Sequence, residues 1–273
     1  NLDDTELFTQ PLRQSTLGVT MRRERTNSIV DPTRGSTASI EIRYASPAIG
    51  SDSLIDFIKG TAEFTSYHPL GRRTTFAWRV RGGAIVRPGF VFLGQGVKFV
   101  PTAERFYGGG PNSVRGYSQN GLGPLVRVIS DIDTISRPGD TLVVDTLMLE
   151  SPTGGNQILL ANAELRFPLP LFGGRLGGSL FADVGQVIER RQRELVGLRD
   201  IRVTPGVGIR IATPLGPMRL DVAYNGYGPQ QGRLYRPRGQ QLDEELAVYP
   251  PASAPPSKWR DRLQWHFAVG QPF

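Results

Sequence analysis

Residues 202–226, RVTPGVGIRIATPLGPMRLDVAYNG, contain two stretches in which apolar and polar side chains alternate. In the first stretch the apolar set is Val203, Val207, Ile209 and Ile211, and the polar set is Arg202, Thr204 and Arg210. In the second stretch Met218, Leu220, Val222 and Tyr224 alternate with Arg219, Asp221, Ala223 and Asn225. A period of two residues is typical of a β-strand with one apolar and one polar face. The short TPLGP between them, residues 213–217, predicts a turn that joins two such strands.

The same alternation recurs along the chain. In LQWHFAVGQPF, residues 263–273, the apolar face carries Leu263, Trp265, Phe267, Val269 and Phe273, opposite Gln264, His266, Ala268 and Gly270. The complete set of predicted strands is 16–27, 36–45, 54–67, 75–88, 156–168, 175–188, 202–212, 218–226 and 263–273. Each is about ten residues long, which is the length that lets a tilted strand cross the bilayer core.

Composition agrees with an all-β fold. The 273 residues include 33 Gly and 22 Pro but no Cys, and only 38% are hydrophobic. This profile disfavours a helical bundle and favours many strands joined by turns. The mean hydropathy of −0.25 fits a soluble protein or an outer-membrane barrel, because a barrel strand presents only alternate residues to lipid. No window is apolar enough for a membrane-spanning helix, and the chain opens without an initiator Met or a signal peptide.

The lengths of the connections favour a transmembrane antiparallel β-barrel. The short connections are 28–35, 68–73, 168–175 and 213–217, and the long ones between them include 89–155, 189–201 and 229–260. Outer-membrane barrels have tight turns at the periplasmic side and long loops outside. The alternation therefore predicts a bacterial outer-membrane location with the C-terminus facing the periplasm.

The strand number predicts that the barrel is incomplete. Nine is odd, whereas single-chain bacterial barrels have an even number of strands, and an open sheet would leave two unpaired edges in lipid. We expect the missing strands to belong to another polypeptide or to a longer protein of which residues 1–273 are the C-terminal part.

The longest connection, 99–155, contains ERFYGGGPNSVRGYSQNGLGP at residues 104–124. Its glycines permit tight turns, so this long outer loop is predicted to fold back into the barrel lumen and to carry Arg115 inward. A buried arginine requires a partner. The alternation places Glu164 on the polar face of 156–168 and Asp183, beside Phe181, on that of 175–188, so both carboxylates can accept from the guanidinium. The alternatives are that the glycines are plain turns and the carboxylates ordinary solvated lumen charges.

The motifs RFYGGG, SVRGY, GLGP, NAELRFPLP, GGSLFADVGQV, GVGIRIATPLGPMRLDVAY and FAVGQPF occur in this order over residues 99–273. Together they resemble the C-terminal barrel half of the BamA and TamA family of outer-membrane assembly proteins. The resemblance implies a sixteen-stranded barrel, whose first seven strands and periplasmic POTRA domains are not in this sequence. It also implies a loop–lumen lock formed by Val114, Arg115, Gly116, Tyr117, Glu164, Phe181 and Asp183.

For the last strand, the resemblance implies an outer-membrane targeting signal and one side of a lateral gate, carried by Trp265, Phe267 and Phe273. A plain strand end is the alternative. A gate of this kind would template incoming strands by β-augmentation. The implied partners are outer-membrane lipids and lipopolysaccharide, nascent β-barrel clients or other assembly subunits, and a second polypeptide that completes the barrel. The rival interpretations are an accessory barrel subunit of a larger complex and a passive porin.

Other functions find little support in the sequence. The net charge is +7, but the arginines are scattered and no nucleic-acid recognition motif is present. The only histidines are His68 and His266, and no nucleophile elbow or P-loop occurs, so no enzyme activity, metal or cofactor is expected. Residues 229–260 are predicted to be an extended outer loop in which LDEELAV forms one helical turn, and Tyr227, Trp259 and Trp265 suit an aromatic girdle.

Overall fold

A computed structural model describes residues 12–86, 100–137, 140–170, 176–189, 201–213, 217–227, 230, 232–238, 241–249 and 258–270. For 130–147 and 236–249 the description covers the backbone only. Phe273, expected at the end of the terminal strand, lies outside the described residues. Within the described part, no helix combines the length and the apolar character needed to cross a membrane.

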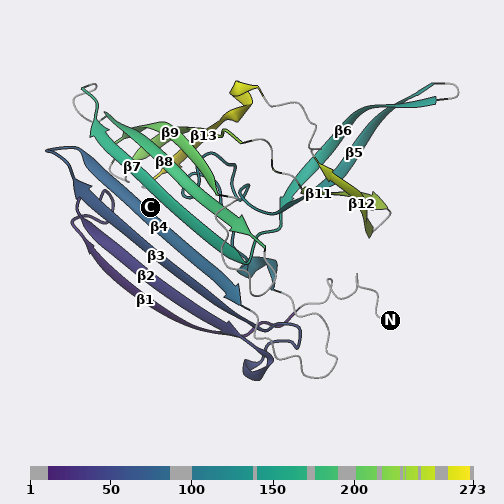
Figure 1. The fold of residues 1–273 in the computed structure, drawn as a ribbon, viewed down its shortest axis with the longest axis horizontal. Coiled ribbons are helices and arrows are strands. Elements are labelled where there is room, and N and C mark those ends of the chain that lie inside the picture. Colours follow the sequence, from purple (N-terminus) through teal and green to yellow (C-terminus); the bar gives the residue numbers. More distant parts are fainter. Residues whose placement is uncertain are drawn as a thin grey trace.

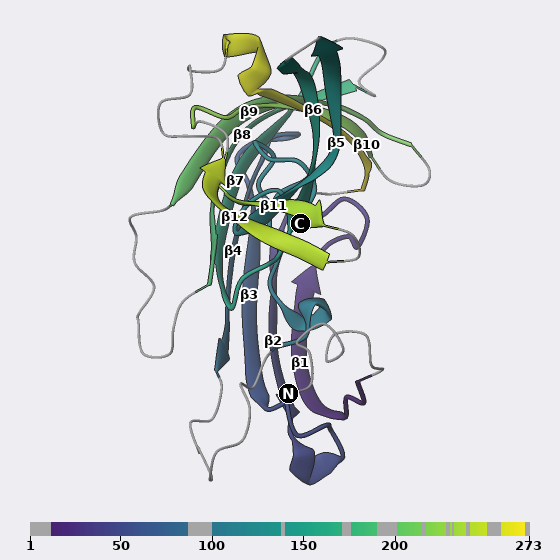
Figure 2. The same ribbon diagram turned by 90° about the vertical axis from the view of Figure 1, so that its right-hand side faces the viewer.

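The larger of two sheets is a nine-stranded antiparallel sheet, curved into a trough (Figures 1 and 2). Its strands, in spatial order, are β1 (Thr16–Thr26), β2 (Gly35–Ala45), β3 (Phe57–Pro69), β4 (Thr75–Val86), β7 (Gln157–Pro168), β8 (Leu176–Ile188), β9 (Arg202–Ile211), β10 (Met218–Tyr224) and β13 (Leu263–Val269). These are the nine strands predicted from the alternation, and the all-β fold is confirmed. Among the described residues the two edge strands, β1 and β13, each pair with one neighbour only.

The alternation sorts side chains between the two faces of this sheet. In β7 every second residue from Ile158 to Arg166 is buried on the concave face, and the residues between them face outward. The convex face carries a band of exposed apolar side chains, which suits contact with lipid. This band includes Leu17, Val19, Met21, Val203, Val207, Ile209, Ile211, Trp265, Phe267 and Val269.

The concave side, which we call the lumen, contains the hydrophobic core. Residues 100–124, which we call the lumen loop, lie inside the curve of the sheet (Figure 2). They begin with the short 3₁₀ helix η2 (Thr102–Glu104). The core cluster joins the loop to the sheet and consists of Ala45, Ile55, Phe57, Ile85, Val100, Phe106, Val114, Tyr117, Leu122, Ile158, Leu160 and Val187. A connection between strands therefore supplies part of the core that a globular protein would build from its regular elements.

The second sheet has four strands and arises from the connections that the sequence predicted as loops. Its order is β12 (Gln241–Tyr249), β11 (Gly232–Arg238), β5 (Leu125–Arg137) and β6 (Asp140–Pro152). The long β5–β6 hairpin projects away from the curved sheet (Figure 1). The prediction of a helical turn at LDEELAV is wrong, because residues 241–249 form β12 and pair antiparallel with β11. Two further 3₁₀ helices are η1 (Pro47–Ile49) and η5 (Trp259–Arg262).

Candidate functional site

The tip of the lumen loop folds into a compact turn that presents Arg115 to the sheet. Gly109 and Gly110 have φ angles of 99° and 95°, in the left-handed region that favours glycine. The amide of Gly110 donates to the carbonyl of Tyr117 at 3.0 Å, and the amide of Leu122 donates to Gly108 at 3.0 Å. The run of glycines thus makes a defined turn and does not leave the loop extended.

Arg115 is completely buried and forms a two-pronged ion pair with Asp183 of β8. Its Nε lies 2.8 Å from Oδ2 and its Nη2 lies 2.9 Å from Oδ1 of that carboxylate. Nη1 donates to Oε2 of Glu164 on β7 at 2.9 Å. The backbone amide of Arg115 also donates to Asp183 at 3.0 Å. The structure therefore brings Arg115 to both carboxylates that the sequence had paired with it.

Two further groups complete the surroundings of the guanidinium. Asp221 of β10 lies 3.4 Å from Nη1, so a third carboxylate faces the same cation. The guanidinium carbon lies 3.3 Å from the centroid of the Phe181 ring, which makes a cation–π contact on β8. Sequence reasoning missed Asp221, although the alternation in 218–226 had placed it on the polar face.

The carboxylates are shared with arginines of the wall. Glu164 also accepts from Arg166 at 3.1 Å and from Arg210, and Asp221 accepts from Arg219 at 2.9 Å. Burial lowers the pKa of the Arg115 guanidinium, but the facing carboxylates outweigh this effect, and the net shift raises its pKa. Arg115 therefore stays charged at every physiological pH.

Backbone carbonyls of the loop tip accept hydrogen bonds from side chains of several strands. The donors and acceptors are Arg79 to Asn112, Arg219 to Pro111, Asn162 to Ser113 and Asn225 to Gly116. In addition, the ring Nε2 of His266 lies 2.7 Å from the carbonyl oxygen of Arg115. Because His266 belongs to β13, this bond connects the loop tip directly to the last strand.

The remaining predicted residues of the motif pack around the arginine. Val114 and Tyr117 are buried members of the core cluster. Gly116 lies against Thr204 of β9 so closely that a Cβ on Gly116 would overlap its side chain. Trp265 and Phe267 do not belong to this cluster. They lie on the convex face of β13 and are 64% and 63% exposed. The structure thus separates the predicted site into a lumen cluster and an outward-facing pair.

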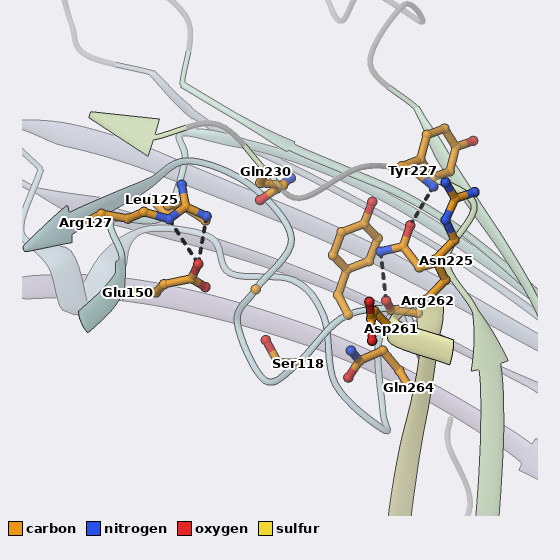
Figure 3. A pocket seen from close by; sticks show the side chains of 13 residues that line it. Ser118, Leu125, Arg127, Glu150, Asn225, Tyr227, Gln230, Asp261, Arg262 and Gln264 are labelled. Atoms are coloured by element: carbon orange, nitrogen blue, oxygen red, sulfur yellow. Dashed lines mark hydrogen bonds and ion pairs between the residues drawn. The ribbon is translucent and has the colours of Figure 1, made fainter. Parts of the chain in front are cut away.

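A pocket of about 300 Å³ lies beside the loop tip (Figure 3). Tyr117 and Ser118 of the loop, Asn225 and Tyr227 after β10, and Gln264 of β13 contribute to its lining. At one side Arg127 at the base of β5 pairs with Glu150 of β6 at 2.7 Å. The pocket therefore lies where the lumen loop, the second sheet and the terminal strand meet. Within the described part of the chain, no three His, Cys, Asp or Glu side chains are grouped as a metal site.

Comparisons with known proteins agree with this architecture. A profile of the Omp85 superfamily domain matches residues 5–273. The outer membrane protein assembly factor BamA of Nitratidesulfovibrio vulgaris is 37% identical over 217 residues, which cover 79% of this chain and 23% of that protein. The BamA of Neisseria meningitidis serogroup B is 28% identical over 228 residues, or 74% of this chain and 25% of that protein. The chain therefore spans about a quarter of the length of these relatives.

Two further similarities extend the comparison. The sorting and assembly machinery component 50 homolog of Mus musculus is 32% identical over 169 residues, which cover 62% of this chain and 29% of that protein. The crystal structure of BamA from Haemophilus ducreyi lacking POTRA domains 1–3 superposes with a TM-score of 0.60. That alignment covers 93% of this chain and 42% of the other at 19% identity, and it shows a common fold.

Proposed function

Because the chain belongs to the Omp85 superfamily, we propose that it forms the C-terminal part of an outer-membrane assembly barrel that inserts other β-barrel proteins without catalysing a covalent reaction. Similarity to two BamA proteins, each named as an assembly factor, supports this proposal. The remaining strands and POTRA domains would belong to the rest of a longer protein. Its substrates would be nascent barrel chains, and its surroundings would be outer-membrane lipid and lipopolysaccharide, with other assembly subunits as partners.

The observation that supports the mechanism is that the loop tip contacts both the barrel wall and the last strand. Arg115 is held by carboxylates of β7, β8 and β10, and its own carbonyl oxygen is bonded to His266 of β13. In the proposed mechanism this loop–lumen lock keeps the wall and the last strand in register. The outer edge of β13 is then free to pair with an incoming strand through backbone hydrogen bonds.

The lengths of the connections support a C-terminus that faces the periplasm. The connections β1–β2 and β3–β4 are short, whereas β4–β7 and β10–β13 carry the second sheet. In outer-membrane barrels the elaborated connections lie on the outer side. Trp265 and Phe267, exposed on the convex face of β13, would then contact lipid near the gate.

The test compares Arg115→Ala and Arg115→Lys with the parent in the full-length protein. Lysine keeps the charge but cannot form the fork with Asp183, and alanine leaves the buried carboxylate of Asp183 without its cation, which costs about 3–5 kcal/mol. Both variants should gain protease cuts within 100–124 and insert a barrel client into lipid vesicles more slowly, with alanine the more severe. Arg22→Ala, which removes an exposed pair with Glu24, is the matched control and should behave as the parent.

Three outcomes decide between the interpretations. An unchanged cleavage pattern in Arg115→Ala would show that no lock exists. New protease cuts within 100–124 in the Arg115 variants, with an unaltered insertion rate, would show that the lock has a purely structural role. A parent protein that inserts nothing would favour the accessory barrel subunit.

A further inference from the structure

The base of the lumen loop contains a buried carboxylate that the lock does not use. Glu104 ends the helix η2 and is only 7% exposed. Its Oε2 lies 3.2 Å from Nζ of Lys59 on β3, and Nη1 of Arg43 on β2 lies 3.4 Å from both carboxylate oxygens. Gln14, just before β1, donates to Oε1 at 3.0 Å. A carboxylate buried to this degree requires such partners, because removing them would leave an uncompensated charge.

The residues that follow Glu104 strengthen the same contact. Nζ of Lys59 lies 5.1 Å above the ring of Phe106, so one ammonium group serves both the carboxylate and the aromatic ring. The ring of Phe106 occupies the space above Gly83 of β4, where a Cβ would lie 2.6 Å from it. The backbone of Phe106 exchanges two hydrogen bonds of 2.9 Å with Gly155. The base of the lumen loop is therefore held in position by specific contacts, as the tip is.

The two contact regions of the loop lie on different flanks of the curved sheet. The base contacts β2, β3 and β4 through Arg43, Lys59 and Gly83. The tip also contacts β4, where Arg79 donates to the carbonyl of Asn112, but its other partners lie on the opposite flank, on β7, β8, β9, β10 and β13. Between base and tip, Val114 and Leu122 belong to one buried cluster with Phe106. The loop consequently connects strands near both edges of the sheet across the lumen.

We infer that Glu104 is a second positioning residue of the lumen loop, which holds the base on β2 and β3 while Arg115 holds the tip on β7, β8 and β10. With both ends held, the loop fixes the spacing of the two flanks and hence the curvature of the sheet. Loss of Glu104 would release the first flank alone. The consequence for assembly rests on the proposed function, but the positioning itself does not.

The experiment measures amide hydrogen exchange in the full-length protein in lipid bilayers. Glu104→Gln keeps the shape of the side chain and removes its charge, and Lys59→Met removes the main partner. Exchange at residues 102–106 should accelerate about tenfold in either variant, while 113–117 stay protected, because local opening follows the lost contact. The acceleration of exchange in the double variant should be much smaller than the two single-variant effects combined, since the two side chains act as one unit. Glu63→Gln, which alters a pair with Arg81 on the same wall without touching the loop, is the matched control.

Client insertion measured on the same samples separates this inference from the proposed function. Unchanged exchange at 102–106 in both single variants would overturn the inference, whatever the insertion rate. Faster exchange confined to 102–106 with normal insertion would support Glu104 as a positioning residue and show that assembly does not depend on the base of the loop. If Glu104→Gln does not fold, Lys59→Met and Arg43→Met carry the same test.

Discussion

Arg115 makes contacts that only an arginine can combine at one position. Its Nε and Nη2 form the fork with Asp183, its Nη1 reaches Glu164, and its plane lies on the ring of Phe181. A lysine ammonium carries its three donors on one nitrogen and cannot form the planar fork with Asp183 or stack on the ring of Phe181. In the proposed mechanism, the buried cluster stabilises one position of the loop in preference to others.

Glycine is required at position 116 because the side chain of Thr204 lies so close to it. Its backbone does not require glycine, since Gly116 is not one of the glycines with a positive φ. Gly116→Ala would drive a methyl group into Thr204 of β9 and displace the neighbouring Arg115. We expect a loss of about 1–3 kcal/mol, the usual cost of overpacking, seen as a lower temperature for the heat-induced gel shift. Thr204→Gly in the same chain should restore part of the loss. A Gly116→Ala protein with the parent transition temperature would contradict the packing.

The sequence predicts the partners of Arg115 only in part. Glu164 and Asp183 follow from alternation within single strands, because each shares a polar face with its neighbours. Asp221 reaches the same guanidinium only after the register across β8, β9 and β10 is fixed. Glu104 lies outside any strand, so periodicity carries no information about it.

The terminal strand β13 pairs with β10 over seven residues, with Ala223 opposite Gln264. If assembly uses the outer edge of β13, a covalent link on its inner side should be harmless. A disulfide formed in the double variant Ala223→Cys, Gln264→Cys should therefore leave client insertion unchanged, and the 273 residues contain no native cysteine to interfere. Insertion that stops on oxidation and returns on reduction would mean that β13 must leave β10.

The difference between the predicted and unpredicted strands has a physical cause. Strands of the curved sheet have one face toward lipid and one toward the lumen, and the side chains of β7, β9 and β10 alternate between them without interruption. In β5 and β6 the register shifts twice, between Ile129 and Asp131 and between Asp133 and Thr134, and each irregularity breaks the period of two. In β11 a shift follows Arg233, and Pro237 removes one donor. Because their alternation is interrupted, these strands could not be predicted from the sequence.

In the part of the chain that the structure describes, the strands form two sheets that share no strand. The second sheet pairs only within itself, and the chain connects it to the curved sheet at the lumen loop, at residues 153–156, after β10 and before β13. The contacts that hold the lumen loop involve the curved sheet, whereas the outer part of the β5–β6 hairpin projects away from it (Figure 1). Folding of the barrel wall should consequently be independent of that hairpin.

Replacing residues 130–147 with an Asn-Gly turn tests this independence. The turn would join β5 and β6 next to the pairing of Ile129 with Met148, and it suits a two-residue hairpin. The ion pair of Arg127 with Glu150 stays in place below it. We expect the shortened protein to keep the heat-induced gel shift, with its transition moved by less than about 4 °C, equivalent to ~1 kcal/mol. Protease protection of 100–124 should also remain. A protein that lost the gel shift would show that the second sheet is needed to fold the wall, and the lumen loop alone would then be insufficient to hold the curved sheet.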